Sequence, residues 1–353
     1  MSEVIQSKPF SHSDARRLVK DLFEPNPWVY WTDFSITYSL GFATFFLGVE
    51  FSPLLADATL ATNCLFIVLF AASCLAFYRA AIFIHEVVHI RPTGRMKSFR
   101  FMWNMLCGIP FLVPSFIYYT HIDHHRTKHF GTDADGEYVS LANGPRFQMV
   151  FFVVAALFVP LLAIIRFSIL TPLAWCIPGL RTLVHKHASS LVMDPSYIRP
   201  LPKPRVVRVI QFQEFCCFAW CIACFLGASA FWGEQLNIAL VHTYAIAVVA
   251  IILNNMRTLG AHRWHSDGQE MTLEEQLLDS VNYPNFAWIG EMWGPVGLRF
   301  HALHHLFPSM PYHSLPTAHR RLVDKLPPDS LYLQTEEASL TSGICRLWRS
   351  TRQ

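Results

Sequence analysis

Residues 60–89 read LATNCLFIVLFAASCLAFYRAAIFIHEVVH, a long apolar run that ends in two histidines four positions apart. A helix that crosses a bilayer needs roughly 20 mostly apolar residues, and residues 60–84 meet that length. His85 and His89 follow directly, and positions four apart share one face of a helix. The stretch therefore predicts a membrane-spanning helix that presents two imidazoles just beyond the membrane edge.

The composition of the whole chain indicates the same class of protein. Of its 353 residues, 52% are hydrophobic and 15% are Asp, Glu, Lys or Arg. Soluble domains usually carry about 25% charged residues, and a chain with 14% aromatic residues is too apolar to stay disordered. A net charge of +3 is too small to indicate nucleic-acid binding. The nine cysteines lie mostly in apolar stretches and show no disulfide framework.

Two apolar segments, 101–119 and 147–180, are less regular than the rest. Pro110 and Pro114 interrupt the first, and the second is too long for one span and contains prolines and Arg166. We expect both to dip into the membrane as re-entrant or interfacial helices without crossing it. The predicted crossings are the four regular apolar segments, at about 34–53, 60–84, 210–232 and 236–256.

The charges of the connecting segments predict the topology. Connections 54–59 and 233–235 contain no Lys or Arg, whereas every other connection is basic and is therefore expected on the cytoplasmic side. The sequence predicts an all-α integral membrane protein with four transmembrane helices in two hairpins and a cytoplasmic histidine-rich cap. We expect it in the inner (cytoplasmic) membrane. The predicted domains are a cytoplasmic N-terminal segment 1–32, a membrane-embedded domain 33–325 and a polar C-terminal tail 326–353.

Histidines are concentrated in short clusters that each follow an apolar segment. The second and third clusters have spacing i, i+3, i+4, so on a helix each would present its imidazoles on one face. A fourth element, which begins at His262, follows the last predicted span. The clusters are His85-Glu86-Val87-Val88-His89, His121-Ile122-Asp123-His124-His125, His301-Ala302-Leu303-His304-His305 and His262-Arg263-Trp264-His265.

The number of imidazoles indicates more than one metal ion. Imidazole binds iron, zinc, copper and nickel well, and nine such ligands exceed the needs of a single ion. Two octahedral ions with open positions could use them. A ligand set of histidines alone suits a redox metal that attacks a strong C–H bond. The HExxH motif also matches a zinc protease with Glu86 as general base, but that reading leaves at least six histidines unexplained.

The first three clusters are called the first, second and third histidine boxes below. With the hydrophobic segments between them, they resemble the membrane-bound fatty acid desaturase and hydroxylase superfamily. The resemblance runs from about residue 30 to 325. Residues 257–263 are similar to the family's ligand-bearing end of the last span, and residues 297–301 and 311–315 resemble its bacterial acyl-chain branch. The resemblance implies two non-haem Fe2+ ions, O2 as co-substrate, and no catalytic residue beyond the metal centre. The implied ligands are His85, His89, His121, His124, His125, His262, His301, His304 and His305.

Other polar residues near the boxes are expected to hydrogen-bond to the ligands. Metal-bound histidine usually donates its second ring nitrogen to a carboxylate or another acceptor. Asp133, Asp135 and Glu291 could supply such carboxylates. The main candidates for this supporting role are His265, Asp123, His129 and Asp267.

The resemblance implies oxidation of a fatty acid or fatty acyl chain, and we expect desaturation. Hydroxylation and oxidative decarboxylation of a free fatty acid to a terminal alkene are alternatives, because all three reactions share the same ligands. The chain lacks haem, iron–sulfur and nucleotide-binding motifs, so electrons must come from a separate ferredoxin- or rubredoxin-type donor with its reductase. A basic cytoplasmic face would suit an acidic carrier.

A non-catalytic membrane metal-binding or transport protein is the alternative of a different class. Such a protein needs polar or charged residues inside its spans to mark an ion path. Segments 34–53 and 236–256 contain almost none near their centres. The sequence therefore favours the enzyme.

Overall fold

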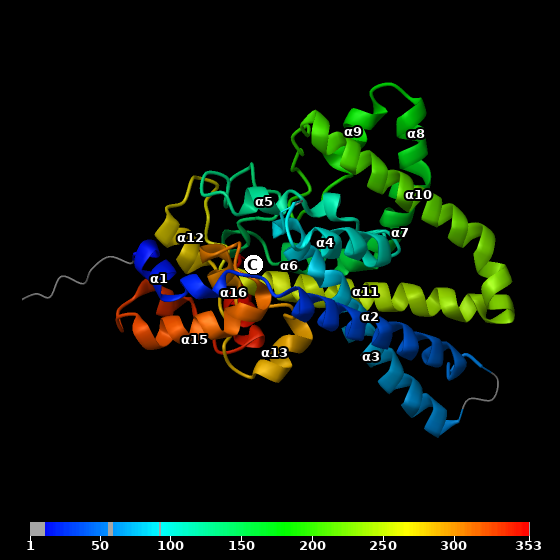
Figure 1. Cartoon of the computed structure of the whole chain (residues 1–353), viewed down its shortest axis with the longest axis horizontal. Helices are drawn as coiled ribbons and strands as arrows, with labels where there is room; N and C mark the ends of the chain where they lie inside the picture. The colour runs from blue at the N-terminus through cyan, green and yellow to red at the C-terminus, as the bar shows by residue number, and fades with distance from the viewer. Residues whose placement is uncertain (1–10, 56–58, 92, 353) are drawn as a thin grey trace, which may run out of the picture. The chain divides into compact units, whose positions relative to one another are not determined.

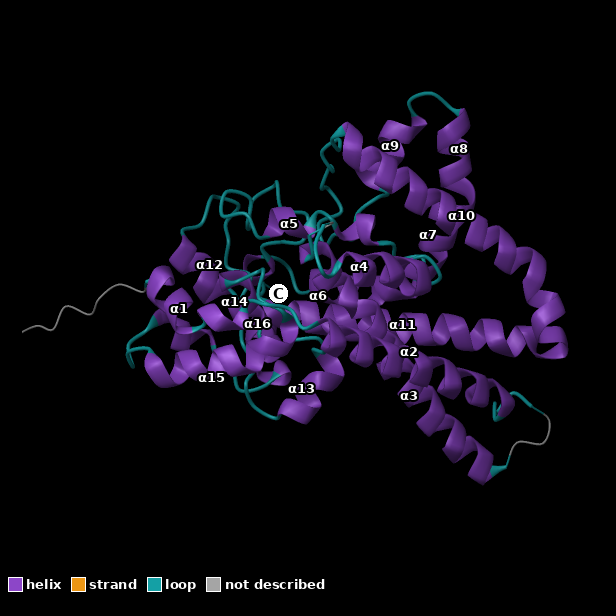
Figure 2. Ribbon diagram, in the orientation of Figure 1, coloured by secondary structure: helices purple, strands orange, loops and turns teal. Residues whose placement is uncertain are grey.

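The computed structural model describes residues 11–55, 59–91 and 93–352. Within these residues all regular secondary structure is helical, joined by loops with a few isolated β-bridges (Figure 2). The prediction of an all-helical chain is confirmed for this part of the sequence. The chain packs as two units, which are described separately: unit 1 comprises 1–26, 122–149 and 257–353, and unit 2 comprises 27–121 and 150–256.

Unit 2 begins with a pair of long helices that lie side by side, α2 (Pro27–Glu50) and α3 (Leu60–His89) (Figure 1). Thr59 and Thr62 form a capping box that fixes where α3 starts. At 1.5 Å per residue, α3 is about 45 Å long, which exceeds the roughly 30 Å of bilayer hydrocarbon. Its last turns, with His85 and His89, are therefore available for a site outside the apolar layer.

The third and fourth predicted spans also lie in unit 2. Segment 210–232 falls in α10 (Pro204–Trp232), and segment 236–256 falls in α11 (Leu236–Ala261). Gly233 separates them with a φ of 53° and a ψ of −126°, a conformation that glycine adopts most readily. The short 3-10 turn η7 (Gly233–Gln235) completes the connection.

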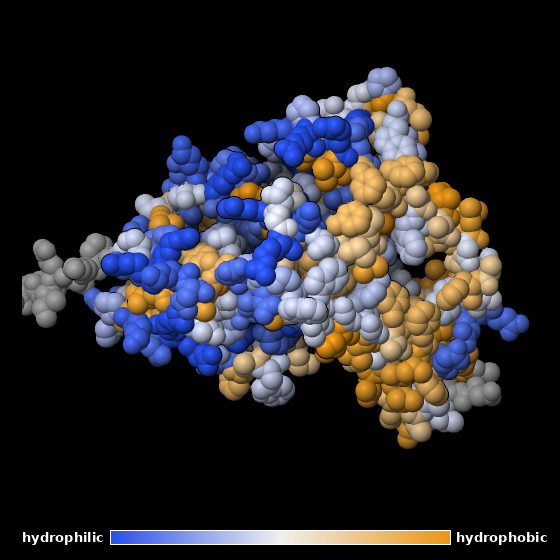
Figure 3. Space-filling model, in the orientation of Figure 1, coloured by the Kyte–Doolittle hydropathy of each residue, from blue (hydrophilic) through white to orange (hydrophobic). Residues whose placement is uncertain are grey.

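Three helical stretches of the described residues are long and apolar enough to cross a membrane, which supports an integral membrane protein. They are Leu60–His89, Val159–Cys176 and Pro204–Ala261, the last of which contains both α10 and α11. In Figure 3 much of the surface of α3, α10 and α11 is orange. Helix α2, which holds the first predicted span, is not among the three. The arrangement of four spans in two hairpins therefore stays a prediction.

Segment 147–180 is more regular than its prolines suggest. Pro160 lies in the first turn of α7, where the missing N–H is not needed, and Pro172 follows directly after the π-helical turn Arg166–Leu170. Arg166 is buried and pairs with Glu214, with Nη2 and Oε1 2.5 Å apart. These features explain why Val159–Cys176 forms an apolar stretch of spanning length. The remaining helices of unit 2 are α4 (Lys97–Trp103), η2 (Asn104–Gly108), η3 (Ser115–Tyr118), α6 (Phe147–Val154), η5 (Ala155–Leu157), α7 (Val159–Ile165), η6 (Arg166–Leu170), α8 (Thr171–Cys176) and α9 (Leu180–His187).

Unit 1 is built from shorter helices around one apolar core. The core takes its side chains from α1, α12, α15 and η9, and from the face of α14 that carries Ala302, Leu303 and Leu306. The opposite face of α14 carries the histidines of the third box. The helices are α1 (His12–Leu18), η1 (Lys20–Leu22), α5 (His121–His124), η4 (Leu141–Asn143), α12 (Leu273–Asp279), α13 (Ala287–Trp293), α14 (His301–Leu306), η8 (Tyr312–Ser314), α15 (Leu315–Lys325), η9 (Leu331–Thr335) and α16 (Leu340–Ser350).

Three helices include residues of both units: His121 of α5 belongs to unit 2, residues 147–149 of α6 belong to unit 1, and residues 257–261 of α11 belong to unit 1. The segment predicted as a polar tail contains α16, which a capping box of Ser339 and Ser342 starts. The two units are defined by packing and do not test the predicted domain boundaries at residues 32 and 325. Those boundaries stay predictions.

Candidate metal centre

Four histidines of unit 1 converge on one point. His124, His262, His301 and His305 each offer a ring nitrogen, and these nitrogens all lie within 4.8 Å of one another. The Nε2 atom of His262 is 3.2 Å from that of His124 and 3.0 Å from that of His301. His305 Nε2 lies 3.1 Å from His301 Nε2. Three separate stretches of sequence thus meet in one buried cluster, which we call the four-histidine cluster.

The spacing of these nitrogens fits a bound cation. Imidazole nitrogens that bind one ion at about 2.1 Å, at right angles to each other, lie about 3 Å apart. Iron is among the metals that imidazole binds well. Burial and the neighbouring imidazoles hold the pKa of His305 well below its usual value, so its ring is neutral and offers a lone pair. The donor set therefore fits iron.

Two buried carboxylates orient these imidazoles. Asp135 Oδ2 lies 2.7 Å from His124 Nδ1, and Asp279 Oδ2 lies 3.3 Å from His262 Nδ1, which Ser280 Oγ also contacts at 3.3 Å. Each contact occupies the Nδ1 side of the ring and leaves Nε2 facing the cluster. Burial opposes ionisation of Asp135, but the contact with His124 and two backbone N–H groups hold the pKa of Asp135 below its usual value. The arrangement favours the ring orientation that metal binding needs.

The sequence suggested Asp135 but not Asp279. Asp279 lies 17 positions from His262, and the chain brings them together through a bridge between His262 and Ser280. Backbone bonds from Arg263 N–H to the Asp279 carbonyl, and from Val281 N–H to the Ala261 carbonyl, hold this pairing. A capping box at Thr272 and Glu275, which fixes the start of α12, is the only local signal in this region.

Three further predicted ligands lie together in unit 2. His85 and His89, at the end of α3, have ring centroids 5.5 Å apart. The ring of His121 lies 4.5 Å from that of His85 and 5.2 Å from that of His89. Tyr118 stacks on His121 with ring centroids 4.6 Å apart and an interplanar angle of 12°. The i, i+4 spacing on α3 thus puts both histidines on one face, as predicted.

The last two predicted ligands, His125 and His304, form a pair in unit 1. Their Nε2 atoms are 3.0 Å apart, and the ring of His125 also lies 4.3 Å from that of His305. Both residues belong to boxes with i, i+3, i+4 spacing. The predicted set of nine ligands therefore divides into four histidines in one cluster, a pair in the same unit, and three in unit 2.

The family model described as fatty acid desaturase matches residues 59–336. The chain belongs to the fatty acid desaturase family. This confirms the resemblance that the histidine boxes carry. A protein named ceramide hydroxylase, from Caulobacter vibrioides (strain NA1000 / CB15N), is 38% identical over 342 residues, which cover 96% of this chain and 93% of that protein.

Of the residues predicted to support the ligands of this desaturase-family protein, Asp123 and His129 are half-buried, and His265 and Asp267 are exposed. Asp123 Oδ1 is 2.9 Å from Arg126 Nη1 and 3.8 Å from His129 Nδ1. His265 is exposed, and its backbone N–H donates to Asp279 Oδ1 at 2.9 Å. Asp267 is exposed and accepts from the N–H of Gln269. Their supporting role stays a prediction, and the contacts favour Asp135 and Asp279 for it.

Proposed function

We propose that this desaturase-family protein is an O2-dependent, non-haem diiron hydroxylase that acts on the acyl chain of a ceramide-type lipid. Family membership supports oxidation of an acyl chain. The 38% identity to a protein named ceramide hydroxylase, over nearly the whole of both chains, favours hydroxylation and an amide-linked lipid substrate. The observation that carries the metal chemistry is the four-histidine cluster.

The proposed irons are held by the nine predicted histidines. His124, His262, His301 and His305 would hold one iron, and the other five predicted histidines are the ligands that the family resemblance implies for the second. Two reduced irons, when bound, would supply the activation of O2 that attack on an unactivated C–H bond requires. Asp135 and Asp279 keep the Nε2 atoms of His124 and His262 directed at the ion. His124, His262, Asp135 and Asp279 are all buried, which limits access of water to the ion site.

The relative favours hydroxylation over the desaturation that the sequence suggested. In hydroxylation one oxygen atom of O2 enters the C–H bond and the other leaves as water, with two electrons and two protons from an external donor. Desaturation would instead remove two hydrogens from neighbouring carbons. Oxidative decarboxylation needs a free carboxyl group, which an amide-linked acyl chain does not have. A ceramide-type substrate therefore disfavours alkene formation.

We place the active site at the cytoplasmic face of the inner membrane, because the basic connections predict that side. The electrons would come from a ferredoxin- or rubredoxin-type carrier with its reductase. The absence of haem, iron–sulfur and nucleotide motifs in the sequence supports a separate donor.

The test is product analysis with the full chain in proteoliposomes that contain a ceramide, supplied with Fe2+, O2 and a reducing system. Mass spectrometry should show a product with one added oxygen atom. Loss of two hydrogens would mean desaturation. His262→Ala should abolish the product and lower iron content, whereas His187→Ala, at an exposed position on α9, should do neither.

The same experiment separates the enzyme from a metal carrier. Uptake of iron into the vesicle lumen with no oxygen consumption on any lipid would contradict the proposal. Wild-type product in iron-free protein would contradict it equally.

A further inference from the structure

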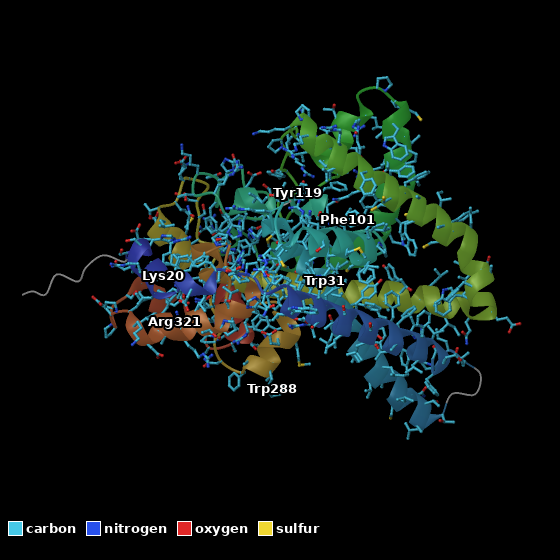
Figure 4. All side chains as sticks on the ribbon, viewed as in Figure 1. Lys20, Trp31, Phe101, Tyr119, Trp288 and Arg321 are labelled. Carbon is cyan, nitrogen blue, oxygen red and sulfur yellow. The ribbon has the colours of Figure 1, made fainter. Side chains whose placement is uncertain are left out.

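Helix α13 presents an unusual apolar surface on unit 1. Phe286 is 65% exposed and Trp288 is 73% exposed, and Ile289 and Met292 are exposed beside them. Trp288 and Met292 are four positions apart and share one face of the helix. Figure 4 shows Trp288 directed away from the ribbon of this unit, and Figure 3 shows α13 in orange and white on a mostly blue surface. We call these four residues the α13 patch.

The patch is concentrated rather than scattered. Among the described residues of unit 1, nine large hydrophobic side chains are exposed, and four of them fall within residues 286–292. Single exposed hydrophobic residues are ordinary, but contiguous apolar patches mark contact surfaces. Phe286 also has a φ of 49°, in the left-handed region that bulky residues seldom adopt. The chain therefore holds this aromatic side chain outward at some conformational cost.

The charge around the patch suits an apolar partner. Residues 280–298 contain one charged residue, Glu291. Its Oε1 atom lies 3.3 Å from Nε of Arg299, so the carboxylate has an opposite charge beside it. A Trp, a Phe and no basic residue fit the layer between lipid headgroups and acyl chains, where tryptophan is enriched. An acidic electron carrier would find no basic residue in 280–298, and the neighbouring Arg299 is buried.

The contacts of α13 lead to the end of a membrane-spanning helix. Trp293, on the opposite face of α13, packs edge-on against Tyr283 with ring centroids 5.1 Å apart. Tyr283 donates from its hydroxyl group to the carbonyl of Gly260 at 2.6 Å. Gly260 lies in the last turn of α11, four residues or about 6 Å beyond the predicted span 236–256. The patch is thus anchored beside the point where α11 leaves the apolar layer.

We propose that α13 is an interfacial helix whose patch inserts into the boundary between headgroups and acyl chains of the lipid bilayer. The lipid surface is the occupant that the exit of α11 favours. The helix is also tied to the third histidine box. Arg299 bonds to the carbonyls of Tyr283 and Pro284, stacks over Phe300 at 4.1 Å, and directly precedes the Phe300–His301 pair. Contact of α13 with lipid would therefore fix His301 at a set height above the acyl chains.

The test uses tryptophan quenching in proteoliposomes of phosphatidylcholine that carries bromine either near the carbonyl end or near the methyl end of its chains. Bromine near the carbonyl end should quench wild-type protein more strongly than bromine near the methyl end. Trp288→Phe should remove much of that difference. Trp293→Phe is the matched control, because this side chain of the same helix packs against Tyr283, and the difference should persist in it.

Quenching by aqueous iodide is the measurement that can contradict the proposal. Equal bromine quenching of wild type and Trp288→Phe, together with iodide quenching of the Trp288 signal in vesicles, would overturn the proposal. Protection of Trp288 from iodide that appears only at high protein density would indicate a second copy of the chain, and would also overturn it. Protection that appears only when an electron carrier is added would do the same.

The position of the third box above the acyl chains is tested by measuring hydroxylation. This step of the inference rests on the proposed function. Trp288→Ser should leave iron content unchanged and lower hydroxylation of bilayer ceramide severalfold, with less effect on detergent-dispersed substrate. Equal loss with both substrates would overturn the link between α13 and the box. Failure of the proposed reaction would leave the wild type inactive while the quenching result still stood, so the two failures are distinguishable.

Discussion

Asn282 holds the third histidine box through its side chain. Its Oδ1 atom accepts a hydrogen bond from the backbone N–H of Leu303 at 3.1 Å, and its Nδ2 atom donates to Thr335 Oγ1 at 2.8 Å. The first backbone N–H groups of a helix have no partner within that helix. Leu303 lies in the first turn of α14, so the fully buried Asn282 caps this helix from outside it.

Asn282→Ala should destabilise the protein and loosen the four-histidine cluster. The substitution leaves the buried N–H of Leu303 and the hydroxyl of Thr335 without this partner, at a cost of about 1–3 kcal/mol. We expect a lower melting temperature in detergent and less bound iron per chain. Asn285→Ala, at an exposed position three residues on, is the control and should change neither. An unchanged melting temperature for Asn282→Ala would refute this role.

Asp135→Asn should weaken iron binding by about 10- to 100-fold, the usual cost of losing an orienting partner. The amide keeps the shape of the side chain but removes the charge that holds His124 Nδ1–H. Competition with a coloured Fe2+ chelator measures the affinity. Asp123→Asn is the matched control, because this carboxylate lies inside the second box but pairs with Arg126. Equal loss in the two variants would assign the orienting role to Asp123 as well.

The local parts of the fold and the site could be predicted from the sequence. Hydropathy and i, i+4 spacing are properties of neighbouring residues, so α3 and the shared face of His85 and His89 follow directly from the pattern. The i, i+3, i+4 spacing of the third box likewise predicted that its histidines share one face of α14, but not that His304 pairs with His125 while His301 and His305 join the four-histidine cluster. Asp135 could be suggested because it lies 11 positions after its partner His124.

The parts that depend on distant pairing could not be predicted. Asp279 meets His262 only because residues 279–281 pair with residues 261–263 at the end of α11, and no spacing rule links them. Arg166 looked like an interruption of an apolar segment because Glu214, its partner, is 48 positions away. The prolines of that segment were misleading because Pro160 lies in a first turn and a π-helical turn precedes Pro172, and neither position can be read from the hydropathy pattern.

His319 should make stability depend on pH. Burial, with a contribution from Arg299, lowers the pKa of His319 to about 4, even though Glu336 Oε1 is 3.4 Å from Nε2. In the unfolded chain its pKa is near 6.5, so acidification protonates the unfolded state first. The stability that the neutral ring contributes is complete above pH 6.5 and is lost as the pH falls toward 4.

At pH 5 this loss amounts to about 2 kcal/mol. His319→Gln cannot titrate but can still hydrogen-bond to the Tyr332 hydroxyl, which lies 2.8 Å from Nδ1. The melting temperature of the wild type should therefore fall more between pH 7.5 and pH 5 than that of the variant. Parallel pH profiles for the two proteins would contradict this assignment.

Glu214→Ala should be one of the most destabilising single substitutions in unit 2. Arg166 is buried and also donates to Thr171, Ser189 and the carbonyl of Ala188, so it stays in place when its carboxylate partner is removed. Removing one member of a buried ion pair costs about 3–5 kcal/mol, because the other charge is left uncompensated.

The double variant Arg166→Met, Glu214→Leu should recover much of that loss, since replacing both charges with apolar residues removes the desolvation penalty as well. The measurement is the melting temperature in detergent of the wild type, the single variants and the double variant, compared as a double-mutant cycle. Arg17→Ala is the control, because Arg17 and Asp14 form an exposed pair on α1 that should contribute less than about 1 kcal/mol. A double variant no more stable than Glu214→Ala would show that the hydrogen bonds of Arg166, rather than its charge balance, stabilise this part of unit 2.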